Sequence, residues 1–233
     1  MVSNNSLNNS ETLWDKRYTK EGAIWGWEPS ETAKLLAEKL APASKVLEVG
    51  FGYGRDIAEL VKEGHFVHGL EESTVGLNLA VQELKKFGLS NKSHLTFGEF
   101  TSAALPQEYF DAIYSHRVLH LLKDNGLVRA FANSAARGLK SGGLLFISAR
   151  DERDFDPEQM IKLEDGRAAY KDTVKGREGH IISFWSEERF EKTFSKKFKI
   201  LSFVKGQEIE SSTNPGKMSH YTIMMAEKKD LSF

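Results

Sequence analysis

Three glycines alternate with aromatic residues in the segment Glu48-Val49-Gly50-Phe51-Gly52-Tyr53-Gly54, which follows a short apolar run and precedes a helical pattern. Glycine has no Cβ, so such a loop turns tightly and lets a ligand approach the backbone closely. The free N–H groups at the start of the following helix can receive a carboxylate or a phosphate. The segment therefore predicts a loop that binds a polar cofactor, although simple turns use glycine as well.

The spacing of these glycines argues against a dinucleotide. A dinucleotide loop reads G-x-G-x-x-G, and its third glycine would fall on Arg55 in this chain. Glu48 stands directly before the loop, where its charge would repel a pyrophosphate but suit a cationic amine or sulfonium. An NAD-dependent oxidoreductase on a Rossmann-type fold is therefore only the second hypothesis.

Five segments, in order, resemble the motifs of class I S-adenosylmethionine (SAM)-dependent methyltransferases. They are residues 46–56, 69–71, 98–100, 110–120 and 138–143. The resemblance covers roughly residues 45 to 150. It implies an enzyme that moves a methyl group from SAM to a small-molecule acceptor by in-line displacement.

The resemblance also implies roles for individual residues. Glu71 would accept both ribose hydroxyls, and Glu99 would accept the adenine amino proton with Phe100 beside the ring. From this stretch, the predicted cofactor pocket comprises Glu48, Gly50, Gly52, Gly54, Glu71, Glu99, Phe100 and Ser115. Each of the acids, taken alone, could be a solvated residue at the end of a strand. Only their occurrence together, in the order of the family's motifs, favours a pocket. A non-catalytic SAM-binding protein is the third hypothesis.

The N-terminal segment is rich in aromatic residues. Residues 14–18 and 25–30 are similar to segments of thiopurine- and tellurite-type methyltransferases, in which this part of the chain folds over the SAM pocket. The resemblance implies that Trp14, Tyr18 and Trp25 contact the cofactor, with cation–π contact to the sulfonium as one role. The alternative is that the tryptophans pack the first helix of the sheet domain onto the sheet.

A charged, irregular segment over 151–184 follows the fifth predicted strand and contains Tyr170, Arg177, His180 and Trp185. By analogy it is a substrate lid that excludes water, and the alternative is a surface loop. Methyl transfer needs a base only if the acceptor arrives protonated, so no catalytic residue is predicted. The candidate substrate residues are His116, His120, Arg150, Tyr170 and His180.

Strand-like and helix-like patterns alternate from about residue 30, which is typical of βαβ units. Helices are expected at 30–40, 55–63, 75–87, 126–139 and from 186, and residues 158–170 could hold another. Strands are expected at 45–49, 66–70, 94–97, 110–115 and 144–148, with a turn at 140–143 before the last of these, and then at 198–205 and 218–227. The prediction is an α/β, doubly wound, Rossmann-like fold: a seven-stranded, mostly parallel sheet with an antiparallel C-terminal edge hairpin.

The composition is that of an ordinary globular protein, and the 233 residues suffice for one large domain. We expect a disordered tail at 1–12 and a single domain at 13–233, in which 13–44 form a cap segment. The formal charge of −1 gives no support for nucleic-acid or membrane binding. The absence of cysteine and of a signal-like segment fits a cytoplasmic protein without a metal site. Monomer and homodimer both remain open.

Overall fold

The computed structural model describes residues 11–122, 124–174, 177–211 and 214–230. Residues 1–10 of the predicted tail lie outside the described residues. Thr12 is described, and it caps the first helix. Within these ranges no helix is both long and apolar enough to cross a membrane.

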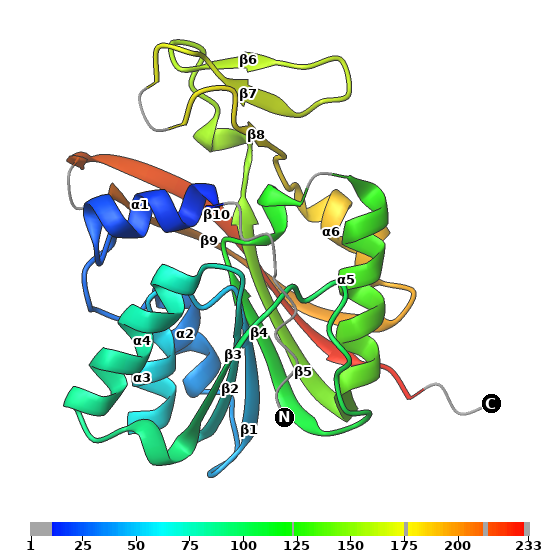
Figure 1. Cartoon of the computed structure of the whole chain (residues 1–233). Coiled ribbons are helices and arrows are strands. Elements are labelled where there is room, and N and C mark those ends of the chain that lie inside the picture. The colour runs from blue at the N-terminus through cyan, green and yellow to red at the C-terminus, as the bar shows by residue number, and fades with distance from the viewer. Residues whose placement is uncertain (1–10, 123, 175–176, 212–213, 231–233) are drawn as a thin grey trace, which may run out of the picture.

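A seven-stranded sheet forms the centre of the molecule (Figure 1). Its spatial order is β3-β2-β1-β4-β5-β10-β9. The first five strands are parallel, whereas β10 runs antiparallel to both β5 and β9. The strands are β1 Lys45–Val49, β2 Phe66–Glu71, β3 Ser93–Phe97, β4 Phe110–His116, β5 Leu139–Arg150, β9 Phe198–Ser211 and β10 Asn214–Lys228. The predicted fold class is confirmed.

Helices cover both faces of the sheet (Figure 1). On one face α2 (Glu31–Ala37), α3 (Arg55–Lys62) and α4 (Thr74–Lys86) bury their apolar side chains against β1, β2 and β4. On the other face, α5 (Asn125–Gly138) and α6 (Glu187–Phe194) form the second core. Because both faces are covered, the strands can be continuous apolar runs, as their sequences predict.

The boundaries of these elements follow the expected local signals. The side chain of Ser30 accepts a hydrogen bond from the N–H of Ala33 and so caps α2. Short 3₁₀ turns lie at η1 (Ser90–Lys92), η2 (Leu119–Leu121) and η3 (Glu152–Asp154). A helix not assigned from the sequence, α1 (Leu13–Glu21), lies above the carboxyl ends of the strands (Figure 1).

Two predictions about strands need correction. The predicted turn at 140–143 is wrong, because β5 already starts at Leu139, and the irregularity is a register shift against β4 with Gly142 at φ +69°. The last two strands are longer than expected. The last part of β9 and the first part of β10 extend past the main sheet and lie over the carboxyl ends of the parallel strands (Figure 1).

The predicted helix at 158–170 is also wrong. This segment forms β6 (Met160–Lys162) and β7 (Ala168–Tyr170), which pair with β8 (Ile181–Ile182) in a small antiparallel sheet. Met160, Ala168 and Tyr170 alternate with more exposed neighbours and share a separate small core, so the period is two rather than 3.6. This sheet stands beyond the carboxyl ends of the main strands (Figure 1).

Candidate functional site

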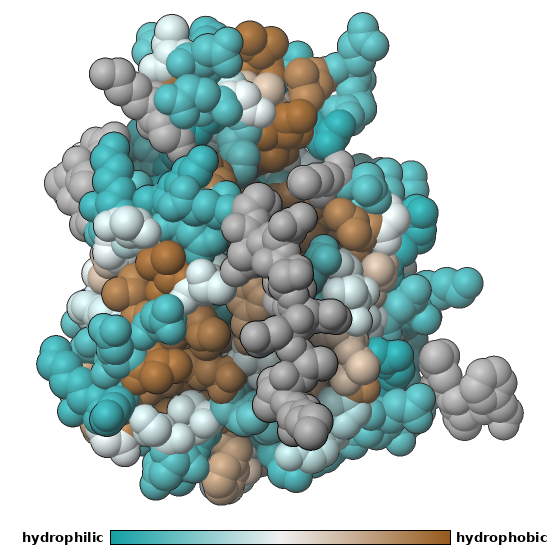
Figure 2. All heavy atoms as spheres, in the orientation of Figure 1, coloured by the Kyte–Doolittle hydropathy of each residue, from teal (hydrophilic) through white to brown (hydrophobic). Residues whose placement is uncertain are grey.

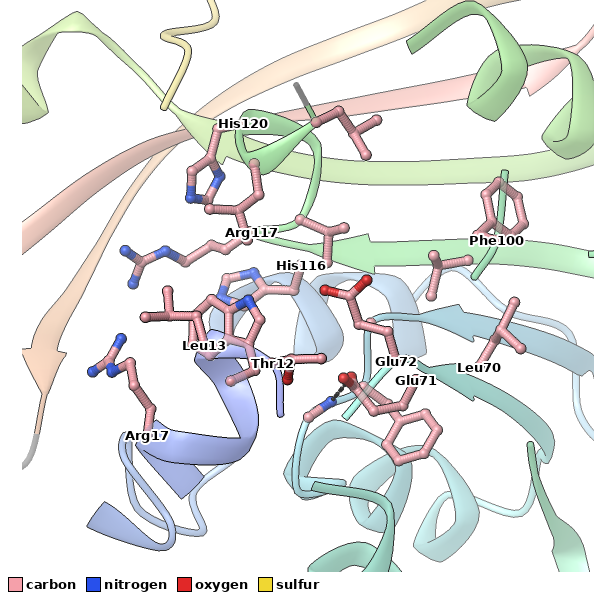
Figure 3. Close-up of a pocket in the computed structure, with 18 of the residues that line it drawn as sticks. Thr12, Leu13, Arg17, Leu70, Glu71, Glu72, Phe100, His116, Arg117 and His120 are labelled. Atoms are coloured by element: carbon pink, nitrogen blue, oxygen red, sulfur yellow. Dashed lines mark hydrogen bonds between the residues drawn. The ribbon is translucent and has the colours of Figure 1, made fainter. Parts of the chain in front are cut away.

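A cavity of about 520 Å³ lies at the carboxyl ends of the parallel strands, the place where open α/β sheets bind ligands. A close-up shows labelled side chains from α1, β2 and the end of β4 around it (Figure 3). The structure brings nearly all of the predicted site residues together in its lining. These are Trp14, Tyr18, Trp25, Glu48, Gly50, Gly52, Glu71, Glu99, Phe100, His116, His120, Arg150, Tyr170 and His180.

Two predicted cofactor residues do not line this cavity. Gly54 has φ +83° and caps α3, and a Cβ there would lie 2.8 Å from the Cβ of Ala80. Ser115 is buried, and its hydroxyl donates to the carbonyl of Val49 across the β1–β4 pair, at 3.1 Å. In this structure both residues hold neighbouring elements in place.

In the loop between β1 and α3, two glycines occupy positions at which a side chain would clash with neighbouring residues. Gly50 and Gly52 have φ values of +71° and +59°, a region that favours glycine. A Cβ on Gly50 would lie 2.3 Å from Val118, and one on Gly52 would lie 2.6 Å from the hydroxyl of Tyr18. The loop thus forms a cradle that only residues without a Cβ can build.

Glu71 connects this loop to the end of β2. Its carboxylate accepts the N–H of Gly52 at 2.7 Å and the N–H of Ser73 at 2.8 Å; the first of these bonds is drawn in Figure 3. Burial raises the pKa of Glu71 to about 7, against the lowering effect of these two N–H groups. A carboxylate at this place can accept hydroxyl groups from a ligand.

Glu48 is a second buried acid in the lining of the cavity. It is buried on β1, and its Oε2 atom has no hydrogen-bond partner among the described residues. Burial and the nearby carboxylate of Asp56 raise the pKa of Glu48 well above its ordinary value. Both effects favour the neutral acid form of Glu48. The unpartnered oxygen marks a polar position that a bound ligand can satisfy.

The N-terminal segment is anchored over the loop by Asp15. This carboxylate accepts the hydroxyl of Ser73 at 2.7 Å and the N–H of Val75 at 3.1 Å, and it also closes the capping box with Thr12. Burial opposes ionisation, but these hydrogen bonds outweigh it and lower the pKa of Asp15. A single side chain thus fixes the start of α1 to the start of α4.

The aromatic residues of this segment form a cluster that also faces the cavity. Trp14 stacks on Tyr18, and Trp25 stacks on Tyr53. The cluster packs against Val75 and Leu79 of α4, and α2 contributes nothing to it. Packing and contact with a ligand are thus compatible here. The indole N–H of Trp25 donates to the carbonyl of Glu210 at 2.9 Å, so the N-terminal segment also meets the end of β9.

The three candidate histidines differ in how they are held. Both ring nitrogens of His116 are engaged: Nε2 with Glu208 at 3.0 Å, and Nδ1 with Ser148 at 2.8 Å and with Thr32. In contrast, His120 is 4% exposed and its Nδ1 has no partner in the described part of the chain. Burial and the charges of Arg150 and Arg117 lower the pKa of His120 well below its ordinary value.

His180 lines the same part of the cavity. Burial and the charges of Arg177 and Arg17 lower its pKa. Both His120 and His180 are therefore neutral at neutral pH, so each has a free nitrogen lone pair able to accept a proton.

Several charged residues of the cavity were not among the predicted site residues. Arg17, Arg117 and Glu208 all line it. Glu208 binds Arg55 and Arg117, each at 2.8 Å. Burial opposes ionisation of Glu208, but His116, Arg117 and Arg55 lower its pKa well below the ordinary value. No spacing signal links these residues, because they come from α1, the end of β4 and the last hairpin. Among the described residues, no group of His, Asp and Glu side chains is arranged to hold a metal ion.

Comparison with known proteins agrees with this geometry. Residues 46–143 match the family model of a methyltransferase domain. The sterol 24-C-methyltransferase ERG6B of Gibberella zeae is 31% identical over 140 residues, which is 55% of this chain and 36% of the relative. The chain thus spans little more than a third of the length of this curated relative.

Solved structures extend the similarity of fold to most of the chain. A SAM-dependent methyltransferase from Methanosarcina mazei has a TM-score of 0.70 at 19% identity, over 84% of this chain and 97% of its own. The 1,6-didemethyltoxoflavin-N1-methyltransferase of Burkholderia thailandensis, solved with its substrate and S-adenosylhomocysteine, has a TM-score of 0.64 at 17% identity, over 91% and 81% of the two chains. The resemblance found in the sequence is confirmed to this extent: residues 46–143 match a methyltransferase domain, and the chain has the fold of solved SAM-dependent methyltransferases.

Proposed function

We propose that this protein is a SAM-dependent methyltransferase that acts on a small-molecule acceptor. The observation that carries the proposal is the hydrogen bond from the N–H of Gly52 to the carboxylate of Glu71, within the stretch that matches a methyltransferase domain. It places the backbone N–H of a glycine next to a carboxylate at the end of the neighbouring strand. That arrangement suits a nucleoside joined to an amino acid.

The residues present fit the cofactor. Glu71 would accept the ribose hydroxyls, while Glu99 and the buried Phe100 would hold the adenine. The unpartnered Oε2 of Glu48 and the aromatic residues Trp14 and Trp25 would face the amino-acid end and the sulfonium. When bound, SAM supplies a methyl group on a positively charged sulfur whose departing thioether is neutral.

The chain's own contribution is to bind the acceptor, to orient it and to exclude water from it. An acceptor atom that is already deprotonated, or an amine with a free lone pair, needs no help beyond alignment. For an acceptor that arrives protonated, His120 and His180 are the residues able to take the proton, because both are neutral and line the cavity. His116 is less suited, since both of its nitrogens are already bonded.

The small sheet of β6, β7 and β8 would serve as the lid. It places Tyr170 and His180 in the cavity wall and stands over the strand ends (Figure 1). Such a cover would exclude water from the acceptor and so remove the hydration shell of its reacting atom. We also place the protein in the cytoplasm, as a monomer or homodimer without nucleic-acid or membrane partners.

A sterol acceptor, as in the name of the Gibberella relative, is less well supported than a polar one. A sterol needs a cavity that is apolar over most of its length. Here the part of the lining that comes from β5, the lid and β9 includes Arg150, Arg177 and Glu208.

The test is calorimetric titration with S-adenosylhomocysteine, followed by transfer of labelled methyl from SAM to a set of thiols, amines, phenols and acids. We expect binding to the purified protein and transfer to at least one acceptor. Absence of binding would rule the proposal out. Binding without transfer to any acceptor would favour the non-catalytic SAM-binding protein instead.

The oxidoreductase alternative is disfavoured by one contact. Arg55 occupies the place of the third glycine, and its guanidinium binds Glu208 at 2.8 Å and lies over Trp25. A pyrophosphate would have to approach this filled position. A thermal-shift response to NADH, with none to S-adenosylhomocysteine, would reverse the preference.

A further inference from the structure

Tyr170 of the lid is held in an unusual way at the cavity wall. Its phenol oxygen accepts Nη1 of Arg150 at 2.6 Å and Nη1 of Arg177 at 2.8 Å. A phenol oxygen has two lone pairs and one hydrogen. Both lone pairs are therefore used, and the hydroxyl hydrogen has no acceptor among the described residues. Tyr170 presents a donor with nothing to receive it.

Two further polar atoms nearby are buried without a partner. Nε of Arg150 and Nδ1 of His120 have none within the described ranges, although these residues are only 5% and 4% exposed. Both residues line the cavity. A buried donor without a hydrogen-bond partner costs free energy. The unpartnered Nε of Arg150 therefore marks a position next to which a ligand acceptor can bind.

The carboxylates that balance these arginines stand outside the cavity wall. Arg150 pairs with Asp154 at 2.7 Å and Arg177 pairs with Glu210, and neither acid lines the cavity. Glu208 does line it, but it is already bonded to arginines on two sides. At this end of the cavity, hydrogen-bond donors of Arg150 and Arg177 therefore line the wall, while the carboxylates that pair with them lie outside the lining.

The two sides of the cavity differ in charge (Figure 3). Arg17, Arg117 and His120 lie on one side in this view, and Glu71, Glu72 and Phe100 lie on the other. The charged neighbours with the largest effects on the pKa values of His120 and His180 are all basic. A ligand group that enters this side meets basic side chains.

We propose that Arg150, Tyr170, Arg177 and His120 form a binding site for a carboxylate of the methyl acceptor, so that the acceptor is a small organic acid. The inference rests on the proposed methyltransferase function. A planar carboxylate accepts several N–H and O–H groups at once and matches a guanidinium. Because each arginine already has a carboxylate partner, the site offers spare donors rather than a large net charge. That favours a singly charged carboxylate over a doubly charged phosphate.

The carboxylate of SAM itself is a second source of the same chemistry. The sheet order places β4 between β1 and β5, so β5 lies two strands, or about 10 Å, to the side of β1. Arg150 also lies four residues beyond Phe146, which is level with Glu48 through Tyr114. Tyr170 and Arg177 come from the lid above it. We therefore assign the site to the acceptor, and the experiment separates the two sources.

The first arm of the test measures S-adenosylhomocysteine binding by calorimetry in wild type and Tyr170→Phe, with Tyr109→Phe as a matched control far from the cavity. Melting curves verify that all three proteins are folded. We expect equal affinity within about twofold. A loss of about tenfold or more confined to Tyr170→Phe would mean that the cluster holds the cofactor's carboxylate, and would overturn the assignment.

The second arm titrates the same proteins with benzoate, benzamide and phenyl phosphate, with and without saturating S-adenosylhomocysteine. We expect benzoate to bind wild type and Tyr109→Phe, and to lose about tenfold or more in Tyr170→Phe. Equal binding of benzamide, unchanged binding of benzoate to Tyr170→Phe, tighter binding of phenyl phosphate, or no binding of benzoate would each overturn the proposal. Failure of S-adenosylhomocysteine to bind would instead refute the proposed function, and the benzoate titration of the free protein would remain readable.

Discussion

The two ends of the cavity are built in different ways. At the cofactor end the ligand would meet backbone: Gly50 and Gly52 clear a path, and Glu71 is fixed by an N–H of the same loop. At the acceptor end it would meet side chains, with Arg150 from β5, Tyr170 from β7 and Arg117 from the end of β4. A site made of backbone needs a short stretch of particular residues, whereas a site made of side chains can draw on the whole chain.

The largest expected effect tests the backbone end. Gly52→Val should abolish binding of S-adenosylhomocysteine, a loss of about a hundredfold or more, because φ is +59° and a side chain would meet Tyr18. Gly88→Val is the matched control, since Gly88 also has positive φ but open space around it. Calorimetry on folded variants checks this. Equal losses in both variants would show that strain, not obstruction of the loop, is the cause.

A smaller effect concerns the charge of Glu71. Because its pKa is about 7 and only the ionised form accepts two hydroxyls, affinity for S-adenosylhomocysteine should fall about tenfold between pH 8 and pH 6. Glu71→Gln should bind weakly at both pH values and lose this dependence. Glu72 and Glu48 are the neighbouring acids. An unchanged pH profile in Glu71→Gln would assign the titration to one of them.

The acceptor end should also lose on acidification, but in stability rather than in affinity. The folded state lowers the pKa of His120, so as pH falls below about 6.5 the unfolded state takes up a proton first and folding weakens, by at most about 1.4 kcal/mol per pH unit. His120→Gln should lose less stability than wild type between pH 7 and pH 5. Urea unfolding curves measure the difference. Parallel losses in the two proteins would remove His120 as a source.

The smallest expected effect is at Glu48. Burial raises the pKa of Glu48 well above its ordinary value, which favours the neutral acid. Glu48→Gln would then replace one neutral polar side chain by another of similar size. The free energy of unfolding at pH 7 should change by about 0.5 kcal/mol or less. A stabilisation of several kcal/mol would indicate that Glu48 is ionised in the native protein.

The same contrast explains how far the sequence could be interpreted. The glycine spacing, the Ser30 cap and the apolar strand runs are local signals, and the sheet and most of the cofactor end follow from them. The strands β6 and β7 were missed, because their period-two pattern extends over only three residues on each side of a turn at Gly166. Such short runs do not outweigh helical propensity.

The acceptor end was out of reach for a different reason. Arg117 stands inside a recognised motif, yet nothing local shows that it would meet Glu208, 91 residues later. His116 was a sound candidate by type, and only the three partners around its ring reveal that it is fully bonded. Contacts of this kind depend on where the long β9 and β10 end, which no short pattern specifies.

The bond from the indole of Trp25 to the carbonyl of Glu210 spans 185 positions. During synthesis on the ribosome the loop, the strands β1 to β5 and the lid all emerge before residue 210 does. The mouth of the cavity thus acquires its final rim only after residue 210 has emerged. A nascent chain stalled before β9 would lack this contact, so Asp15, bonded to Ser73 and Val75, would have to hold the N-terminal segment over the loop without it.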